Sequence, residues 1–323
     1  MQLLKNISSI DFLGKRKITA VFSVVLVGIS LFFLITKGLN LSIDFTGGSV
    51  IEVSYEQAAD LGTIRETLDA NGFTKSVVQN FGTVNDVMIR VPVEAEGTDV
   101  ANSVKTSQAV FQLLEEIANT NDKVTLRRVE FVGPQFGKEL VEGGILALLY
   151  ALGFVLVYVA FRFEWKFGLG SISALVHDVI ITIGAFAILQ LEFSLSVLAA
   201  ILAVIGYSLN DTIVVFDRIR ENFRKMRETD TVHIMNESVN QTLPRTILTS
   251  LTTLLVLVAL FLFGGESLQG FSIALIIGVL IGTYSSIFVA SPVVLALGVT
   301  KSDLMIQKVE KEGADHADLD LIP

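Results

Sequence analysis

Six apolar runs, each close to twenty residues long, decide most of what this chain can fold into. They cover residues 17–36, 141–161, 169–189, 195–216, 247–264 and 271–297. A helix needs about 20 apolar residues to cross the roughly 30 Å hydrocarbon core of a bilayer. Hydrophobic residues make up 51% of the chain and charged residues only 18%. We therefore expect a polytopic α-helical membrane protein with six transmembrane helices.

Basic residues in the short connections predict the orientation. They occur before the first run, after the second, after the fourth and in the tail, where they are Lys5, Lys15, Arg16, Arg162, Lys166, Arg218, Arg220, Arg224, Lys225, Arg227, Lys301, Lys308 and Lys311. The connections after the third and fifth runs carry none. Since Lys and Arg in short loops stay in the cytoplasm, both termini, residues 1–16 and 299–323, are expected there.

The polar segment 40–137 then lies on the opposite side of the membrane. Its pattern predicts strands at 49–55, 76–81, 84–91 and 123–132, and helices at 57–71 and 98–118. This βαββαβ order indicates a ferredoxin-like α+β domain. A slip in the alternation at Arg127 and Arg128 indicates a β-bulge.

Asp211 is the residue whose position most needs an explanation. It lies inside the fourth apolar run, among Ser208, Asn210 and Thr212. A carboxylate near the centre of a membrane helix costs about 2.5–3.5 kcal/mol on insertion scales, so it normally faces a bundle interior or water. We interpret Asp211 as a candidate for an ion path.

The fifth run carries a stripe of hydroxyl groups next to Arg245. Thr242, Thr246, Thr249 and Thr253 recur on one face of the expected helix, which we place as beginning near Pro244. A single Thr can bond the carbonyl of its own helix four residues back. For the whole stripe together with Arg245, we favour a hydrated path.

Two further runs carry features with competing interpretations. Asp178 in the third run, beside His177, is either a third ion-coupling residue with Asp211 and Arg245, or half of a buried pair that fixes helix packing. Small residues every fourth position in the sixth run, at Ala274, Gly278, Gly282, Ser286 and Ala290, are typical of close helix packing.

The segment 218–243 is polar and amphipathic, and we expect it on the cytoplasmic side. Its apolar residues, Phe223, Met226, Ile234 and Val239, either lie on the membrane surface or belong to a solvated helical linker.

Several classes of function are disfavoured by composition. The chain has no cysteine, so disulfides and thiolate metal sites are excluded. His177, His233 and His316 lack zinc spacing, and the net charge of −9 argues against nucleic acid. We expect no catalytic residues, no metal site and no enzyme activity.

Several long stretches resemble the SecF family of bacterial protein-export membrane proteins, in the RND superfamily. They are Ile43-Asp44-Phe45-Thr46-Gly47-Gly48, Ala174 to Asp178, Gly206 to Asn222, Gln241 to Leu243, and Arg245-Thr246. The resemblance covers essentially the full length of the chain. It implies an RND-like half bundle of six helices in the inner membrane, with the ferredoxin-like domain in the periplasm.

The resemblance also implies partners and a mechanism. SecD would complete the bundle, the SecYEG channel would be assisted at a late stage of secretion, and YajC is a further candidate partner. The substrate would be an unfolded preprotein, and H⁺ or Na⁺ would be the coupling ion, with no other cofactor. In that picture Asp211 and Arg245 lie on the ion path. The residues Asp44, Phe45, Thr46, Gly47 and Gly48 would form a hinge between the first span and the periplasmic domain.

Two other functions stay open at this point. The first is an RND-type half-transporter for lipid or small molecules. The second is a non-transporting scaffold subunit in which Asp211 is purely structural. Replacing Asp211 by Asn separates a scaffold from an ion-coupled motor, because Asn keeps the shape and much of the hydrogen bonding of Asp.

Overall fold

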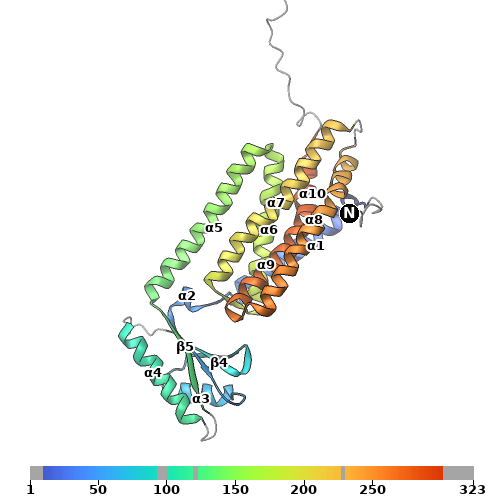
Figure 1. Cartoon of the computed structure of the whole chain (residues 1–323). Helices are drawn as coiled ribbons and strands as arrows, with labels where there is room; N and C mark the ends of the chain where they lie inside the picture. The colour runs from blue at the N-terminus through green and yellow to red at the C-terminus, as the bar shows by residue number, and fades with distance from the viewer. Residues whose placement is uncertain (1–9, 93–99, 119–122, 227–229, 301–323) are drawn as a thin grey trace, which may run out of the picture.

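The computed structural model describes residues 10–92, 100–118, 123–226 and 230–300. A helical bundle and a smaller sheet domain make up this part of the chain, and the sheet domain lies at one end of the bundle (Figure 1). Residues 1–9 and 301–323 of the expected cytoplasmic ends, and residues 227–229 of the amphipathic segment, lie outside the described residues.

Six helices of the described chain are long and apolar enough to cross a membrane, as the sequence predicted. They are α1 (Arg16–Thr36), α5 (Pro134–Arg162), α6 (Trp165–Leu189), α7 (Leu195–Lys225), α8 (Thr231–Phe263), and α9 (Gln269–Ser285), which continues through a π-helical turn (Ser286–Ala290) into α10 (Ser291–Ala296). Short 3-10 turns at Leu13–Lys15 and Glu266–Leu268 precede α1 and α9.

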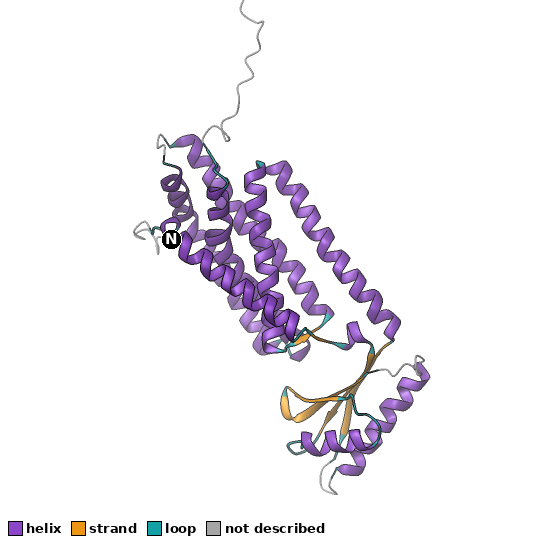
Figure 2. Cartoon of the chain, turned by 180° about the vertical axis from the view of Figure 1, so that it is seen from behind, coloured by secondary structure: helices purple, strands orange, loops and turns teal. Residues whose placement is uncertain are grey.

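The sheet domain confirms the predicted ferredoxin-like order. Its elements are β2 (Gly48–Ser54), α3 (Leu61–Ala70), β3 (Val77–Phe81), β4 (Thr83–Val91), α4 (Val100–Ile117) and β5 (Thr125–Val132). The strands form one antiparallel sheet in the order β3-β4-β2-β5, and both helices lie on the same face of it (Figure 2). The register skips from Glu52–Arg128 to Val53–Leu126, so Arg127 is the extra residue of the predicted bulge.

Close contact between α7 and α9 holds the centre of the bundle together. The predicted small-residue stripe on α9 lies against α7: Ala274 is fully buried, and a side chain at Gly278 would run into Val204. A Cβ atom at Gly282 would come within 3.0 Å of Ser208. Lipid supplies no hydrophobic force between helices, so such close backbone approach is what drives their association.

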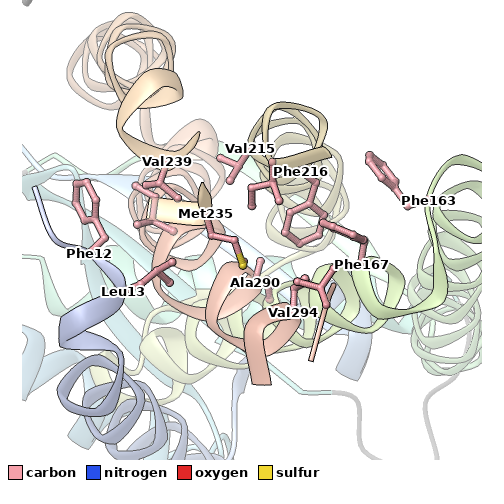
Figure 3. Close-up of a cluster of buried hydrophobic side chains, with 14 of the residues drawn as sticks. Phe12, Leu13, Phe163, Phe167, Val215, Phe216, Met235, Val239, Ala290 and Val294 are labelled. Atoms are coloured by element: carbon pink, nitrogen blue, oxygen red, sulfur yellow. The ribbon is translucent and has the colours of Figure 1, made fainter. Parts of the chain in front are cut away.

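An apolar core (Figure 3) fills the end of the bundle that is remote from the sheet domain (Figure 1). Phe223, Ile234 and Val239 are no more than 1% exposed there, and they pack with Phe216 and Met235. Both interpretations of the amphipathic segment were therefore wrong, since these side chains neither lie on a membrane surface nor belong to a solvated linker. The described parts of this segment are mainly the last residues of α7 and the first turns of α8, which pack on each other.

Pro244 corrects the predicted beginning of the fifth membrane helix. The sequence suggested a first helical turn near Pro244, but α8 begins at Thr231 and runs unbroken past it. Asp230 caps this earlier beginning by accepting a hydrogen bond from Val232 N. A proline inside a helix removes one backbone hydrogen bond and is tolerated where neighbouring helices support the backbone.

Gly278→Ala tests the α7–α9 contact. We expect a loss of about 1–3 kcal/mol in the free energy of unfolding, because the new methyl group overpacks the Val204 contact. Gly28→Ala in α1 is the matched control, since nothing lies within 4 Å of its Cβ position. That change should be neutral or stabilising by about 0.5–1 kcal/mol. Denaturant unfolding of the purified chain in detergent measures both, and equal effects would contradict the packing role.

Candidate functional site

Asp178 is the best-bonded buried acid of the bundle. Its side chain is 1% exposed, and its Oδ2 accepts hydrogen bonds from Ser208 Oγ at 2.6 Å and Ser285 Oγ at 2.7 Å. Its Oδ1 lies 2.9 Å from Nδ1 of His177. One carboxylate on α6 thus joins α7 and α9, and we call these four residues the Asp178 network.

The Asp178 network reaches α1 through an aromatic ring. Tyr284 of α9 stacks on His177 with ring centroids 6.1 Å apart. Its hydroxyl donates to Thr19 O at 3.1 Å and lies 3.0 Å from Ser23 Oγ. Four helices therefore share one connected set of polar contacts, which favours the packing interpretation of the His177–Asp178 pair.

Asp211 has a very different environment, although it lies less than one turn beyond Ser208 on α7. The residue is 3% exposed, and its Oδ2 has no hydrogen-bond partner within the described chain. An unpaired polar atom in an apolar interior costs free energy, and an unpaired charge costs more. Thr212 beside it is buried, whereas Asn210 points to the outer surface of the bundle.

Arg245 of α8 is the charged side chain whose electric field reaches Asp211. The two side chains form no direct ion pair in the described part of the chain, and Arg245 lies exposed on the outside of the bundle. The carboxylate therefore has a cation near it without being bonded to that cation. This arrangement leaves Asp211 able to gain a proton or a metal cation as a partner.

The hydroxyl stripe of α8 is largely satisfied by its own helix. Thr242, Thr249 and Thr253 each donate to a carbonyl four residues back, at 3.1, 3.1 and 2.9 Å. Thr246 is the exception, since its buried hydroxyl has no partner in the described chain. Local back-bonding thus accounts for most of the stripe, and Thr246 is the member that resembles Asp211 in being unpartnered.

Some of the polar residues predicted to lie near Asp211 belong to the Asp178 network. Ser208 was predicted to support Asp211, but its hydroxyl donates to Asp178. Ser285 and Tyr284 were missed, because Ser285 lies one position off the small-residue stripe and nothing in the sequence pairs either residue with the third run. No group of three potential metal ligands among His, Cys, Asp and Glu occurs within the described ranges.

The predicted hinge motif connects the two parts of the chain. It forms a single helical turn, α2 (Ile43–Thr46), followed by two glycines with φ values of 70° and 137°. Ile43 packs in a small cluster with the sheet, whereas Phe45 packs in a cluster of the bundle. A Cβ atom at Gly48 would come within 2.7 Å of Val91 O, so this position requires glycine.

Polar contacts tie the hinge motif to the connection between α6 and α7. Asp44 Oδ2 accepts a hydrogen bond of 2.8 Å from N of Leu195, the first residue of α7. The two-residue strand β1 (Asn40–Leu41) pairs in parallel with β6 (Glu192–Phe193). The helix that carries Asp211 therefore begins at a direct contact with the motif that leads into the sheet.

Asp178→Asn and Asp211→Asn should affect stability in different ways. An amide at position 178 cannot accept all the bonds of the Asp178 network, so we expect a loss of about 2–3 kcal/mol in the free energy of unfolding. Asp211→Asn should leave stability unchanged or raise it, because it removes a buried charge whose Oδ2 is unpartnered. Denaturant unfolding in detergent measures both, and a larger loss for Asp211→Asn would contradict this assignment.

Family models and relatives agree on what the chain is similar to. Residues 112–300 match the model described as protein export membrane protein SecD/SecF, C-terminal, and residues 32–59 match the SecD/SecF GG motif. Protein translocase subunit SecF of Vibrio alginolyticus is 49% identical over 98% of this chain and 99% of its own length. The SecF of Pseudomonas aeruginosa is 50% identical over 93% of this chain and 95% of its own.

Solved structures of SecDF agree with these matches. The crystal structure of SecDF from Thermus thermophilus has a TM-score of 0.80 at 37% identity, covering 92% of this chain and 39% of that one. SecDF in a super-membrane-facing form has a TM-score of 0.66 at 38% identity, covering 90% and 39%. Six membrane-spanning helices, a ferredoxin-like domain, and near-full-length matches at about half identity lead to one conclusion: this chain is an integral membrane protein of the SecF family of protein-export proteins.

Proposed function

We propose that this chain is the SecF-type subunit of a SecD–SecF complex that uses an ion gradient to drive late steps of protein export. Asp211 would bind and release the ion, and Arg245 would set how tightly it is held. Movement of α7 and α8 would then pass to the sheet domain. One elementary charge gains about 2.3 kcal/mol per 100 mV, which is enough energy to bias such a movement.

The buried, unpartnered Oδ2 of Asp211 is the observation that carries this proposal. A proton or Na⁺ at this oxygen would neutralise the charge and supply the missing partner. Loss of the ion would restore the attraction between the carboxylate and Arg245, which acts on it from α8. Binding would thus favour one spacing of α7 and α8, and release another.

Polar groups on the outside of the bundle support a helical partner. Asn210 and Arg245 are exposed on membrane-spanning helices in the isolated chain. Such groups rarely face lipid and normally face other helices or a water-filled cavity. A SecD-type half bundle covering this face would enclose Asp211 and Arg245 at the interface between the two halves.

The proposed setting follows from the charge pattern and the family. The chain would lie in the bacterial inner membrane with residues 1–16 and 299–323 in the cytoplasm and the sheet domain in the periplasm. The sheet domain would act on unfolded preprotein as it leaves the SecYEG channel, with YajC as an accessory partner. The chain would act as a translocase subunit and not as an enzyme.

Asp211→Asn tests the proposed function directly. We expect the gradient-dependent part of export to be lost, because a neutral amide cannot exchange an ion, while assembly with the SecD-type partner continues. The measurement is export of a secreted reporter into membrane vesicles, with co-purification of the partner as the check on assembly. Imposing a H⁺ gradient alone or a Na⁺ gradient alone identifies the ion.

Asp217→Asn is the matched control on the same helix. Asp217 is 40% exposed and pairs with Arg162 at 2.8 Å, so its loss should leave export within about twofold, as expected for an exposed ion pair. Normal gradient-dependent export by Asp211→Asn would overturn the ion-coupling role and favour the scaffold. Lost export together with lost assembly would indicate a structural role for Asp211.

A further inference from the structure

The sheet domain is attached to the bundle through two neighbouring strands. The chain enters β2 at Gly48, the last residue of the hinge motif, and leaves β5 at Val132, two residues before the start of α5. Gly48 and Val132 are opposite each other in the sheet register, so both covalent crossings lie side by side. Two adjacent crossings fix the position of the sheet domain on the bundle. They leave the sheet domain comparatively free to rotate about the line that joins the two crossings.

Arg90 supplies a contact away from this line. It lies on β4, on the other side of β2 from β5, near the end of the sheet that faces the bundle. Its side chain is 8% exposed, with Nη2 3.3 Å from Glu192 Oε2 and Nη1 donating to Leu41 O at 3.2 Å. Rotation of the sheet domain about the two crossings would move β4, and with it Arg90, relative to both Glu192 and Leu41.

Both partners of Arg90 belong to a pair of short strands that is fixed to the bundle. Leu41 lies in β1 and Glu192 in β6, the two paired strands at the ends of α1 and α6. Ser42 N donates to Phe193 O at 3.0 Å, which extends the same pairing. Arg90 therefore joins the sheet domain to the bundle itself and not to a loose loop.

Charged groups surround the contact between Arg90 and Glu192. Burial raises the pKa of Glu192, and Arg90 opposes this rise, while Asp44 and Glu130 add to it. Arg90 is thus the cation that opposes the burial of Glu192, with which it forms an ion pair. Its Nε and Nη2 make no hydrogen bond within the described chain, so Nη1 to Leu41 O is the hydrogen bond that holds the guanidinium, beside the ion pair with Glu192.

We propose that Arg90 is a positioning residue for export, because its contacts with Glu192 and Leu41 set the angle between the sheet domain and the bundle. We call these contacts the clasp. Arg90 has to separate from Glu192 before the sheet domain can move. This inference rests on the proposed function, in which the bundle drives the sheet domain. The paired strands β1 and β6 are the fixed side of the joint, and the chain would turn at Gly47 and at Gly48, the first residue of β2.

A reducible cross-link between positions 90 and 192 tests the clasp. The chain has no cysteine, so Arg90→Cys with Glu192→Cys introduces the only two thiols of this subunit. A cleavable bismaleimide would join them in the assembled complex in membrane vesicles. We expect reporter export to fall at least tenfold after cross-linking and to recover when the cross-link is reduced.

Asn40→Cys with Glu192→Cys is the matched control, because residues 40 and 192 are partners in the β1–β6 pairing. It shares the Glu192 substitution but bridges only the fixed side of the joint, so cross-linking should leave export unchanged. Normal export by the 90–192 cross-linked complex would overturn the proposal, and so would equal loss from both pairs. If the 90–192 pair alone blocks export while Asp211→Asn keeps gradient dependence, the clasp stands and the proposed ion coupling fails.

A distance measurement tests the positioning role without any cross-link. Spin labels at Lys37 and Lys75, both exposed, report the distance between the bundle and the sheet domain. Arg90→Gln should broaden this distance distribution. Arg127→Gln, which breaks the Arg127–Asp86 ion pair inside the sheet domain, should not. An unchanged distribution in Arg90→Gln would show that other contacts set the angle and would overturn the proposal.

Discussion

A carboxylate that enters the membrane has to be hydrogen-bonded, paired or neutralised. The two buried acids of the bundle, Asp178 and Asp211, differ in how far this requirement is met. Asp178 is bonded to groups on its own helix and on two neighbours, and this set of bonds fixes how α6, α7 and α9 meet. Asp211 lies on the same helix as one of those donors and keeps a buried oxygen unpartnered. In the proposed function, the Asp178 network provides the rigid frame against which Asp211 changes its protonation or ion-bound state.

In the proposed function, the chemistry lies near the middle of α7 and the movement is passed on at the first residue of the same helix. Asp211 lies near the middle of α7, and the first residue of α7 donates its N–H to Asp44 of the hinge motif. At 1.5 Å per residue the two points are roughly 24 Å apart. A helix transmits a small tilt over such a distance with little internal change, so no relay of side chains is needed between the ion site and the sheet domain.

The sequence predicted the features that depend on local pattern and length. Six spans, the βαββαβ order and the bulge at Arg127 each follow from periodicity within a short window. The continuation of α8 past Pro244 was not predicted, because packing overrode a local preference. The partner of Ser208 and the contact between Arg90 and Glu192 join residues 30 and 102 positions apart, and a pattern along the chain carries no information about such pairs.

Because α7 and α8 are longer than the membrane is thick, some of the packing in the bundle lies outside the lipid and some lies within it. The 31 residues of α7 span about 46 Å and the 33 of α8 about 50 Å, against a hydrocarbon core of roughly 30 Å. The core around Phe223 and Met235 therefore extends beyond the lipid, where burial releases water and carries a large heat-capacity change. The contact of α9 with α7 at Gly278 lies within lipid and has no such term. Cooling would weaken the core around Phe223 and Met235 and leave the contact at Gly278 nearly unaffected, so two parts of α7 would lose their neighbours at different temperatures.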